Sequence, residues 1–391
     1  MTNLPQGWEV KKLGEIGEIV TGSTPSKSNL DFYGKDYPFF KPSDFEQGYF
    51  LENAGDNLSK LGFDKARQLP PKTILVVCIG SLGKVALTRV IGSCNQQINA
   101  IIPHKNIIAE YIYYYCISSK FQSILFSKAP QTTLAIFNKT EFSKLEIIYP
   151  KDIKEQERIV GILDESFAKI DESIKILEQD LLNLDELMQS ALQKAFNPLK
   201  DNAKENYKLP QGWEWKSLEE ISENISAGGD KPKNCTESKT AKNQIPVYAN
   251  GVNNNGLVGY TDKATIIKPS LTISARGTIG FVCIRKEPYF PIVRLISLIP
   301  CENILCLHYL YFCLNFFIAK GEGSSIPQLT IPKFKSLQIP LPPLKEQEQI
   351  AKHLDFVFEK TKALKELYTK ELKDYEELKQ SLLNKAFKGE L

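Results

Sequence analysis

KEQERIVGILD, at residues 154–164, recurs as KEQEQIAKHLD at residues 345–355. Each copy opens about 40 residues that contain no interior proline and only one glycine, Gly161. Apolar residues in the first stretch recur alternately three and four positions apart, which is the spacing of a coiled-coil seam. Its members are Val160, Leu163, Phe167, Ile170, Ile174, Leu177, Leu181, Leu184, Met188, Ala191 and Ala195. The second stretch has a looser seam of Ile350, Leu354, Val357, Leu364, Tyr368, Leu372, Tyr375, Leu378 and Leu382.

Neither helix can bury its apolar stripe alone, and the chain supplies two of them. We therefore expect the helices to pack on each other, most simply antiparallel, with the parts that precede them at opposite ends. At about 1.5 Å per residue, each helix would be a rod of about 60 Å.

The rest of the chain is also written twice. Matches occur in the same order in both halves, which chance does not supply, so the chain is a tandem duplication. Besides KEQE, the matched segments are LPQGWE (4–9 and 209–214), an apolar strand–turn–strand (74–87 and 271–284), an aromatic segment (110–116 and 307–313) and a helix end, LMQSALQKAF and LKQSLLNKAF (187–196 and 378–387).

Each half begins with a domain of short β-branched and aromatic runs separated by Gly, Pro, Asn and Ser turns, which is typical of strands. One helix is expected near residues 106–120 and its copy near 303–319, and a proline-bearing strand closes each domain at 145–150 and 337–343. The predicted fold class is α+β, with two mixed α/β domains separated by two long helices in an internal pseudo-two-fold repeat. The expected boundaries are 1–152, 153–197, 198–343 and 344–391.

Composition fits an ordinary globular protein, with 42% hydrophobic and 24% charged residues. No apolar run reaches the ~20 residues of a membrane span, and no secretory signal opens the chain, so we expect a cytoplasmic protein. The net charge is +3, but residues 154–196 carry five bases against ten acids, and residues 345–388 carry ten against nine. The remainder therefore carries +7, which agrees with phosphate contact there.

The eight cysteines form no CxxC pair, and most lie in apolar runs, which indicates reduced core thiols. Cys301, Cys306, His308 and Cys313 could be drawn as a zinc site. Because they fall in a segment that resembles a buried helix, core packing is the favoured interpretation.

The motifs of catalysis are missing from the sequence. Its two Pro-Pro pairs, in residues 69–72 and 341–344, lack the amide or carboxylate and the aromatic residue that flank the pair in DNA-amino methyltransferases. Gly83-Lys84-Val85 is no P-loop, because Cys78 stands at the first glycine and Val85 at the hydroxyl position. With three scattered histidines and no defensible nuclease cluster, we expect no catalysis.

Taken in order, these motifs resemble the specificity (S) subunit of type I restriction–modification systems over essentially the whole chain. The resemblance lies in the LPxGW openings, the proline-rich strands that run into KEQE, the two long helices and the final AFKGEL (386–391). No single motif is decisive, but their order, occurring twice, is highly specific. One departure is that the first copy ends AFNPLK (195–200), which leaves the spacing set by this helix and linker open.

The resemblance implies two target-recognition domains, each of which reads one half of a split, asymmetric site in double-stranded DNA. It implies long helices that set the spacing and bind two methyltransferase (M) subunits, together with restriction/translocase (R) subunits. The chain itself would bind no cofactor and no metal, since S-adenosylmethionine, ATP and magnesium belong on the partners.

Polar residues in turns after apolar strands are the candidates for base and phosphate contact. In the first domain they are Lys41, Ser43, Ser81, Lys84, Asn95, Gln96, Gln97, Gln131 and Thr132. In the second domain they are Asn250, Asn253, Asn254, Arg276, Thr278, Arg294, Ser324, Ser325 and Gln328. Turn capping and strand-edge hydrogen bonds are the alternative role for each of them.

Two repeated features have a structural and a functional interpretation. Trp8 and Trp213 could stack on bases, but core anchoring is favoured. KEQE is expected to be a helix N-terminus, with its acids near the positive end of the helix dipole, and to offer some surface to a partner.

For the whole chain, the rivals are a non-catalytic coiled-coil scaffold that joins protein partners and an enzyme with an unfamiliar site. Against the scaffold stand two different sets of polar loops on similar frameworks.

Overall fold

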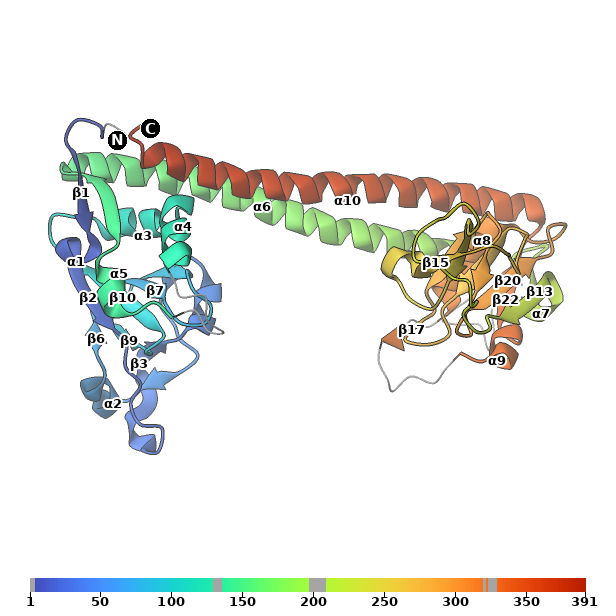
Figure 1. Ribbon diagram of the computed structural model, residues 1–391, viewed down its shortest axis with the longest axis horizontal. Coiled ribbons are helices and arrows are strands. Elements are labelled where there is room, and N and C mark those ends of the chain that lie inside the picture. The colour runs from blue at the N-terminus through green and yellow to red at the C-terminus, as the bar shows by residue number, and fades with distance from the viewer. Residues whose placement is uncertain (1–3, 129–135, 197–208, 319–320, 323–328) are drawn as a thin grey trace. The chain divides into compact units, whose positions relative to one another are not determined.

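The computed structural model of the chain describes residues 4–128, 136–196, 209–318, 321–322 and 329–391. The backbone divides into two units, residues 1–178 with 369–391 and residues 179–368. Each unit contains one globular domain and a segment of both long helices, α6 (Ile153–Phe196) and α10 (Leu344–Ala386) (Figure 1). The globular domains share a framework of strands and helices in the same order, and the first domain has additional short helices.

The first domain is a mixed α/β domain. Its strands are β1 (Trp8–Lys12), β2 (Gly17–Thr21), β3 (Tyr33–Phe40), β4 (Phe50–Leu51), β5 (Asn57–Leu58), β6 (Gln68–Leu69), β7 (Ile74–Val77), β8 (Val85–Thr88), β9 (Gly92–Cys94), β10 (Ile98–Pro103) and β11 (Glu146–Pro150). Its helices are α1 (Leu13–Ile16), η1 (Leu30–Phe32), η2 (Pro42–Gln47), α2 (Lys60–Lys65), α3 (Ala109–Ile117), α4 (Ser119–Lys128) and α5 (Lys139–Ser143). The sheets have the orders β2-β10-β7-β8-β4, β5-β3-β9-β6 and β1-β11.

The second domain repeats this framework. Its strands are β12 (Glu214–Ser217), β13 (Ser222–Ala227), β14 (Ile245–Tyr248), β15 (Leu257–Thr261), β16 (Ser270–Ile273), β17 (Thr278–Ile279), β18 (Val282–Arg285), β19 (Phe290–Pro291), β20 (Ile296–Pro300), β21 (Gly321–Glu322) and β22 (Gln338–Leu341). Its helices are α7 (Leu218–Ile221), η4 (Asn253–Gly256), α8 (Leu307–Phe317) and α9 (Ile331–Lys335). The sheets have the orders β13-β20-β16-β18, β15-β14-β19, β12-β22 and β17-β21.

The apolar strands are explained by burial on both faces of the main sheet. In β7, Ile74 and Val76 face the core that α3 covers, whereas Leu75 and Val77 face a second core. A strand buried on both sides has no reason to alternate apolar with polar residues. The single helix expected near 106–120 is two helices, α3 and α4, because Ser118 has an extended backbone and its hydroxyl accepts a hydrogen bond from the Phe121 amide.

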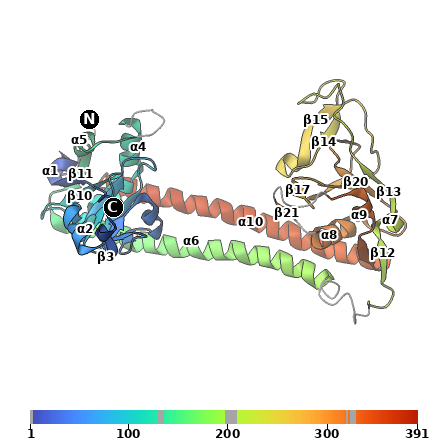
Figure 2. The ribbon, with the colours of Figure 1, turned by 90° about the horizontal axis from the view of Figure 1, so that it is seen from below.

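α6 and α10 lie antiparallel in each unit (Figures 1 and 2). In the first unit Lys379 of α10 pairs with Asp171 of α6 at 2.6 Å, and in the second unit Lys365 pairs with Asp185. The two aspartates are fourteen residues apart along α6, and their two lysine partners are fourteen residues apart along α10, in the opposite direction. That interval is two heptads, so both units use the same helical register.

The seam expected on α6 is confirmed, but the one expected on α10 is partly wrong. Leu364 and Leu378 are 38% and 45% exposed, whereas Thr361 is 2% exposed. The side chains of Lys365 and Lys379 are only 29% and 16% exposed, and their ion pairs with α6 carboxylates make these seam positions tolerable. An apolar period alone could not show that α10 turns polar residues toward its partner.

A buried glutamine of KEQE fixes each long helix to its own domain. The Gln156 side chain accepts a hydrogen bond from Ile108 N–H at the start of α3 (2.9 Å) and donates to Pro150 O at the end of β11 (2.9 Å). Gln347 accepts from Cys306 N–H at the start of α8 (2.9 Å) and donates to Pro342 O (2.8 Å).

Both glutamines are fully buried. The repeated motif therefore marks a structural clamp, in addition to the helix start that the sequence indicates.

The far end of each long helix inserts a phenylalanine into the domain of the other half. Phe387, which follows α10, packs edge-on against Tyr111 and Tyr115 of α3, with ring centroids 5.4 and 5.0 Å apart. Phe196 ends α6 and packs against Tyr309 of α8 at 5.7 Å. Each unit thus combines its own helix start with the helix end of the other half.

The clamp can be tested with Gln347→Leu, which keeps most of the volume but leaves Cys306 N–H and two carbonyls without their partner. A buried polar group without a partner costs about 1–3 kcal/mol, so we expect the free energy of unfolding to fall by at least that amount. Urea denaturation followed by tryptophan fluorescence measures the change. The control is Gln349→Leu, at an exposed position two residues away. Equal midpoints for the two variants would contradict the clamp.

Candidate nucleic-acid interface

The described candidate residues of the first domain lie on three neighbouring loops. Loop A (residues 41–47) follows β3, loop B (78–84) joins β7 to β8, and loop C (95–97) joins β9 to β10. Cys78 N–H donates to Gln97 O at 2.7 Å and ties loop B to loop C, and Asn95 N–H donates to Phe40 O at the end of β3. The fold therefore gathers residues that are far apart in the sequence.

The amide cluster of loop C is partly used inside the turn. Asn95 is 8% exposed, and its side chain donates to the side chain of Gln97 at 2.8 Å. Gln97 reaches toward loop B, with Nε2 3.4 Å from Ile79 O. Gln96 is exposed, and Thr24 donates a hydrogen bond to its side-chain oxygen at 2.5 Å. Gln96 is thus the member of this cluster that projects outward.

The lysines of loops A and B have carboxylate partners within the domain. Lys41 pairs with Asp56, and Lys84 pairs with Glu46. Asp44 is a capping residue, since its carboxylate accepts hydrogen bonds from Lys41 N–H (2.7 Å) and Gly55 N–H (2.9 Å). Ser43 and Ser81 are exposed on the same loops. DNA phosphates would have to compete with the acids for both lysines.

The second domain presents the equivalent loops A′ (249–256), B′ (274–281) and C′ (292–294), and Asn250 joins all three. Its side chain accepts a hydrogen bond from Ala275 N–H of loop B′ at 2.8 Å and donates to Val293 O of loop C′ at 2.7 Å. A single half-buried amide thereby fixes the distance between the loops that carry Arg276 and Arg294. This positioning role could not be read from the asparagine-rich sequence.

Loop C′ is held in a conformation that its residues rarely adopt. Val293 and Arg294 have φ values of 53° and 60°, which is uncommon for non-glycine residues and unfavourable for a β-branched one. Both side chains are exposed, so packing of the side chains does not impose the turn. Such strain persists where the surroundings determine the backbone, often at functional sites. Asn250 and the Arg294 N–H bond to Gly228 O (2.9 Å) supply that constraint.

Arg285 supports loop A′ from beneath and was missed by sequence reasoning. Its guanidinium donates to Asn255 O and to the Thr272 hydroxyl (3.0 Å), and it lies 3.5 Å from the Tyr248 ring centroid. Asn254 and Asn255 both have left-handed backbones above it, and Asn253 and Asn254 are exposed. For Arg285, the sequence offers one signal of this supporting role, which is its position as an arginine at the end of a strand.

Arg276 is exposed on loop B′, whereas the hydroxyl of Thr278 is buried.

Five candidates lie outside the described residues: Gln131, Thr132, Ser324, Ser325 and Gln328. The residues that follow them are tied to the same loops. Phe137 N–H donates to Cys78 O (2.8 Å), and Leu329 N–H donates to Ala275 O (3.2 Å). None of the candidates has been tested for DNA contact, so their roles stay predictions.

Several other sequence features have structural roles. Trp8 packs against the main core of the first domain. The eight cysteines are free, and burial raises the pKa of the Cys78 and Cys94 thiols to about 12. His308 contacts Asp355 at 2.8 Å, and the described residues contain no cluster of three or more metal-ligating side chains. Within the same residues, no helix is long and apolar enough to cross a membrane.

Comparison with known proteins identifies the framework. Residues 5–181 and 210–374 each match the family described as type I restriction modification DNA specificity domain. A specificity subunit of Haemophilus influenzae, HindI, is 37% identical over 46% of this chain and 40% of its own length. The MjaIX specificity subunit of Methanocaldococcus jannaschii is 24% identical over 87% of this chain and 84% of its own length.

Solved structures show the same fold. A chain from a structure of a type I restriction–modification system aligns over the full length of both chains, with a TM-score of 0.82 and 19% identity. The HsdS subunit of Thermoanaerobacter tengcongensis covers 100% of this chain and 98% of its own length, with a TM-score of 0.61 and 20% identity. The chain therefore belongs to the family of type I restriction–modification DNA specificity subunits, as a non-catalytic subunit that recognises DNA sequence through two target-recognition domains.

Proposed function

We propose that the first and second domains read the two different halves of a split, asymmetric site in double-stranded DNA. The observation that carries this proposal is the contrast between framework and loops. Apart from one edge strand, the strand order of the main sheet recurs in both domains, and so do the clamping glutamines. Loop C, by contrast, is NQQ in an ordinary turn, whereas loop C′ is IVR with two left-handed residues. Equal frameworks with unequal reading surfaces favour two unequal half-sites.

Exposed Arg276 and Arg294 suit guanine or phosphate, and exposed Gln96 and Asn253 suit adenine edges. One such domain can specify only a few base pairs. Joining two by helices multiplies their discrimination, because the second binds at a high effective concentration. In this scheme α6 and α10 set the length of the unread spacer.

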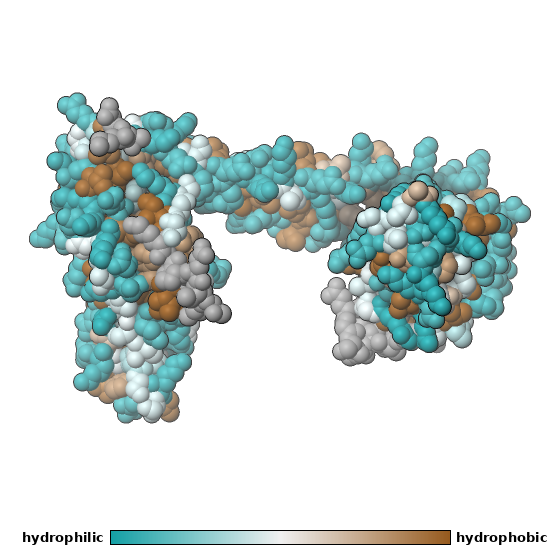
Figure 3. Space-filling view, in the orientation of Figure 1, coloured by the Kyte–Doolittle hydropathy of each residue, from teal (hydrophilic) through white to brown (hydrophobic). Residues whose placement is uncertain are grey.

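We also propose that α6 and α10 bind two methyltransferase subunits, and that the complex also takes up restriction/translocase subunits. On the face that Figure 3 shows, hydrophilic side chains cover most of the surface of the helices, with apolar ones among them. Ile176 and Leu378 are 55% and 45% exposed in the first unit, and Leu187 and Leu367 are 51% and 55% exposed in the second.

The tandem repeat relates Ile176 to Leu367 and Leu187 to Leu378. Two related apolar surfaces favour two copies of one partner. S-adenosylmethionine, ATP and magnesium would be bound by the partners in this arrangement.

Domain exchange tests the assignment of half-sites. Residues 1–150 are replaced by the corresponding domain of another family member. The donor domain should have aromatic residues at the positions of Tyr111 and Tyr115, so that Phe387 can still pack against them. We expect one half of the methylated sequence to change and the other half to stay the same, because each loop set reads independently. Methylome sequencing of cells that express the chimera with its partner subunits is the measurement. Changes in both halves would contradict the proposal.

Asn250 separates loop positioning from stability. Asn250→Asp keeps an acceptor for Ala275 N–H but loses the donor to Val293 O, and Asn250→Ala loses both. We expect discrimination at one half-site to fall by about 5- to 150-fold per affected base pair, as for the loss of a good bidentate contact. Competition binding with single-base variants of the target measures it.

The other half-site is the internal control. A merely structural role would lower the unfolding midpoint and leave both discrimination ratios unchanged.

A further inference from the structure

The two main sheets differ at one edge. In the first domain β4 lies parallel to β8 as a fifth strand, with Phe50 opposite Leu87. Leu87 N–H donates to Tyr49 O at 2.9 Å, and Arg89 N–H donates to Leu51 O at 3.0 Å. In the second domain β18 is the outer strand, and no described strand pairs with its far side. The chain after η4 forms β15, which pairs with β14 instead.

The strand registers identify the unpaired amides. Leu87 faces Ile74 in the first domain, and Ile284 faces Leu271 in the second, at the same point of the repeated hairpin. The counterparts of the Leu87 and Arg89 amides are therefore those of Ile284 and Lys286. An open edge presents such groups for pairing with another strand.

β4 also places Tyr49 against the helices. The Tyr49 ring stacks on Tyr113 of α3, with centroids 4.0 Å apart, and lies 5.6 Å from Tyr114. Tyr114 in turn contacts α6, through a hydrogen bond to Asp164 (2.5 Å) and an edge contact with Phe167 (5.3 Å). Tyr49 thus fills the corner between β8, α3 and α6.

The same corner of the second domain is hollow. The helix registers relate Tyr113 to Tyr311, because Tyr111 and Tyr309 make the same hydrogen bond to the closing strand. The structure therefore shifts the sequence match of residues 110–116 with 307–313 by one residue. A pocket of about 530 Å³ occupies the place of Tyr49, and its walls include Tyr311, Phe312, Asp355, Phe358 and the whole of β18.

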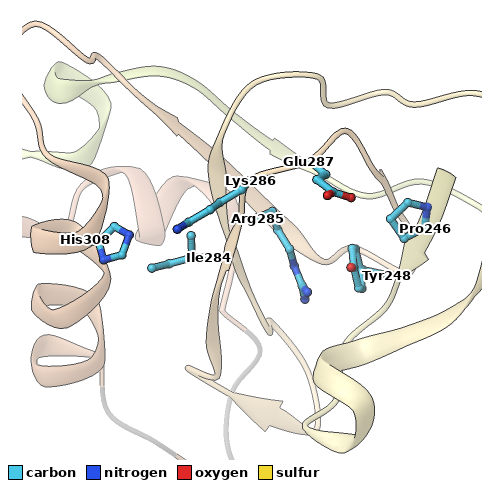
Figure 4. A pocket seen from close by; sticks show the side chains of 7 residues that line it. All are labelled: Pro246, Tyr248, Ile284, Arg285, Lys286, Glu287 and His308. Carbon is cyan, nitrogen blue, oxygen red and sulfur yellow. The ribbon is translucent and has the colours of Figure 1, made fainter. Parts of the chain in front are cut away.

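A second hollow continues along β18. It measures about 370 Å³ and lies between His308 of α8 and Tyr248 of β14, with Ile284 of β18 and Lys286, which follows that strand, between them (Figure 4). The two hollows share Ile284 and Arg285. Because both lie along the open strand, we call the two hollows together the β18 groove.

We propose that the β18 groove binds an extended segment of a methyltransferase subunit, which adds as a strand parallel to β18 and inserts a Tyr or Phe between Tyr311 and Phe358. The first domain supplies the template, because β4 and Tyr49 do this within the chain. Backbone pairing at an exposed edge with a side-chain pocket beside it is a known mode of peptide recognition. The partner's identity rests on the proposed function, since Met188, Phe358 and Lys362 of the groove belong to the helices assigned to methyltransferase binding.

Charge adds a sequence requirement for the segment. Glu52, directly after β4, follows Tyr49 by three positions and pairs with Arg89 at 3.0 Å. The counterpart of Arg89 is Lys286, which is exposed. The bound segment should therefore carry an acid three residues after its aromatic residue. A second copy of this chain is a poor donor, because its own β4 is already paired with β8.

The first experiment uses the full chain and a fluorescent peptide that copies residues 46–53, EQGYFLEN. We expect saturable binding at one site per chain, with slower amide hydrogen exchange at Ile284 and Lys286. A peptide with Tyr49→Ala should bind about tenfold or more weakly, since burial of a large apolar side chain contributes at least that factor.

Tyr311→Leu in the protein should weaken binding of the peptide, whereas Tyr113→Leu in the first domain is the matched control and should not. No binding, or exchange at Ile284 and Lys286 already as slow as at Leu87 and Arg89, would overturn the proposal.

The second experiment uses the assembled complex with its methyltransferase subunits. We expect the same two amides to be protected and the peptide to be displaced. A complex that methylates its specific site, yet leaves both amides exchanging as in the free chain, would overturn the groove proposal and leave the proposed function intact. Peptide-sensitive self-association of the chain would overturn it in favour of a second copy. Failure to form any methylating complex would contradict the proposed function as well.

Discussion

The rest of the structure depends on two buried side-chain amides, those of Gln156 and Gln347. Each side chain accepts a hydrogen bond from a backbone N–H at the start of a domain helix and donates one to a backbone carbonyl at the end of the closing strand. Each long helix is therefore joined to its domain by buried polar groups, which are costly to leave without a partner. A hydrophobic contact of similar area would hold the parts together without fixing their direction. The hydrogen bonds specify where each helix leaves its domain, and hence where the reading loops stand relative to the helices.

The helix pair relies on polar specificity at its seam. Lys365 and Lys379 stand where leucines would give more stability, and their pairs with Asp185 and Asp171 select one register. The leucines displaced from the seam, such as Leu378, lie on the surface. Polar pairs at the seam keep the two helices in a fixed register. Apolar side chains on the outer surface suit a helix pair that also binds other proteins.

Sequence alone predicted the duplication, the long antiparallel helices, the domain type and the turns that carry the candidate residues, because repeats and apolar periodicity are local signals. It could not predict what tertiary contacts decide. On α10 the apolar period selects Leu364, whereas an ion pair with Asp185 of α6 brings the neighbouring Lys365 to the seam. The sequence does not show that the amide of Asn250 joins neighbouring loops, or that the amide of Asn95 is bonded to Gln97 within its own turn. The open edge of β18 depends on a strand that one half forms and the other omits.

Two different loop sets on one framework should recognise two different DNA sequences. Single-molecule methylome sequencing of the native complex tests it most directly. We expect one methylated motif with two unequal specified ends and a fixed unspecified gap between them. A continuous motif, or two identical ends in inverted orientation, would contradict it.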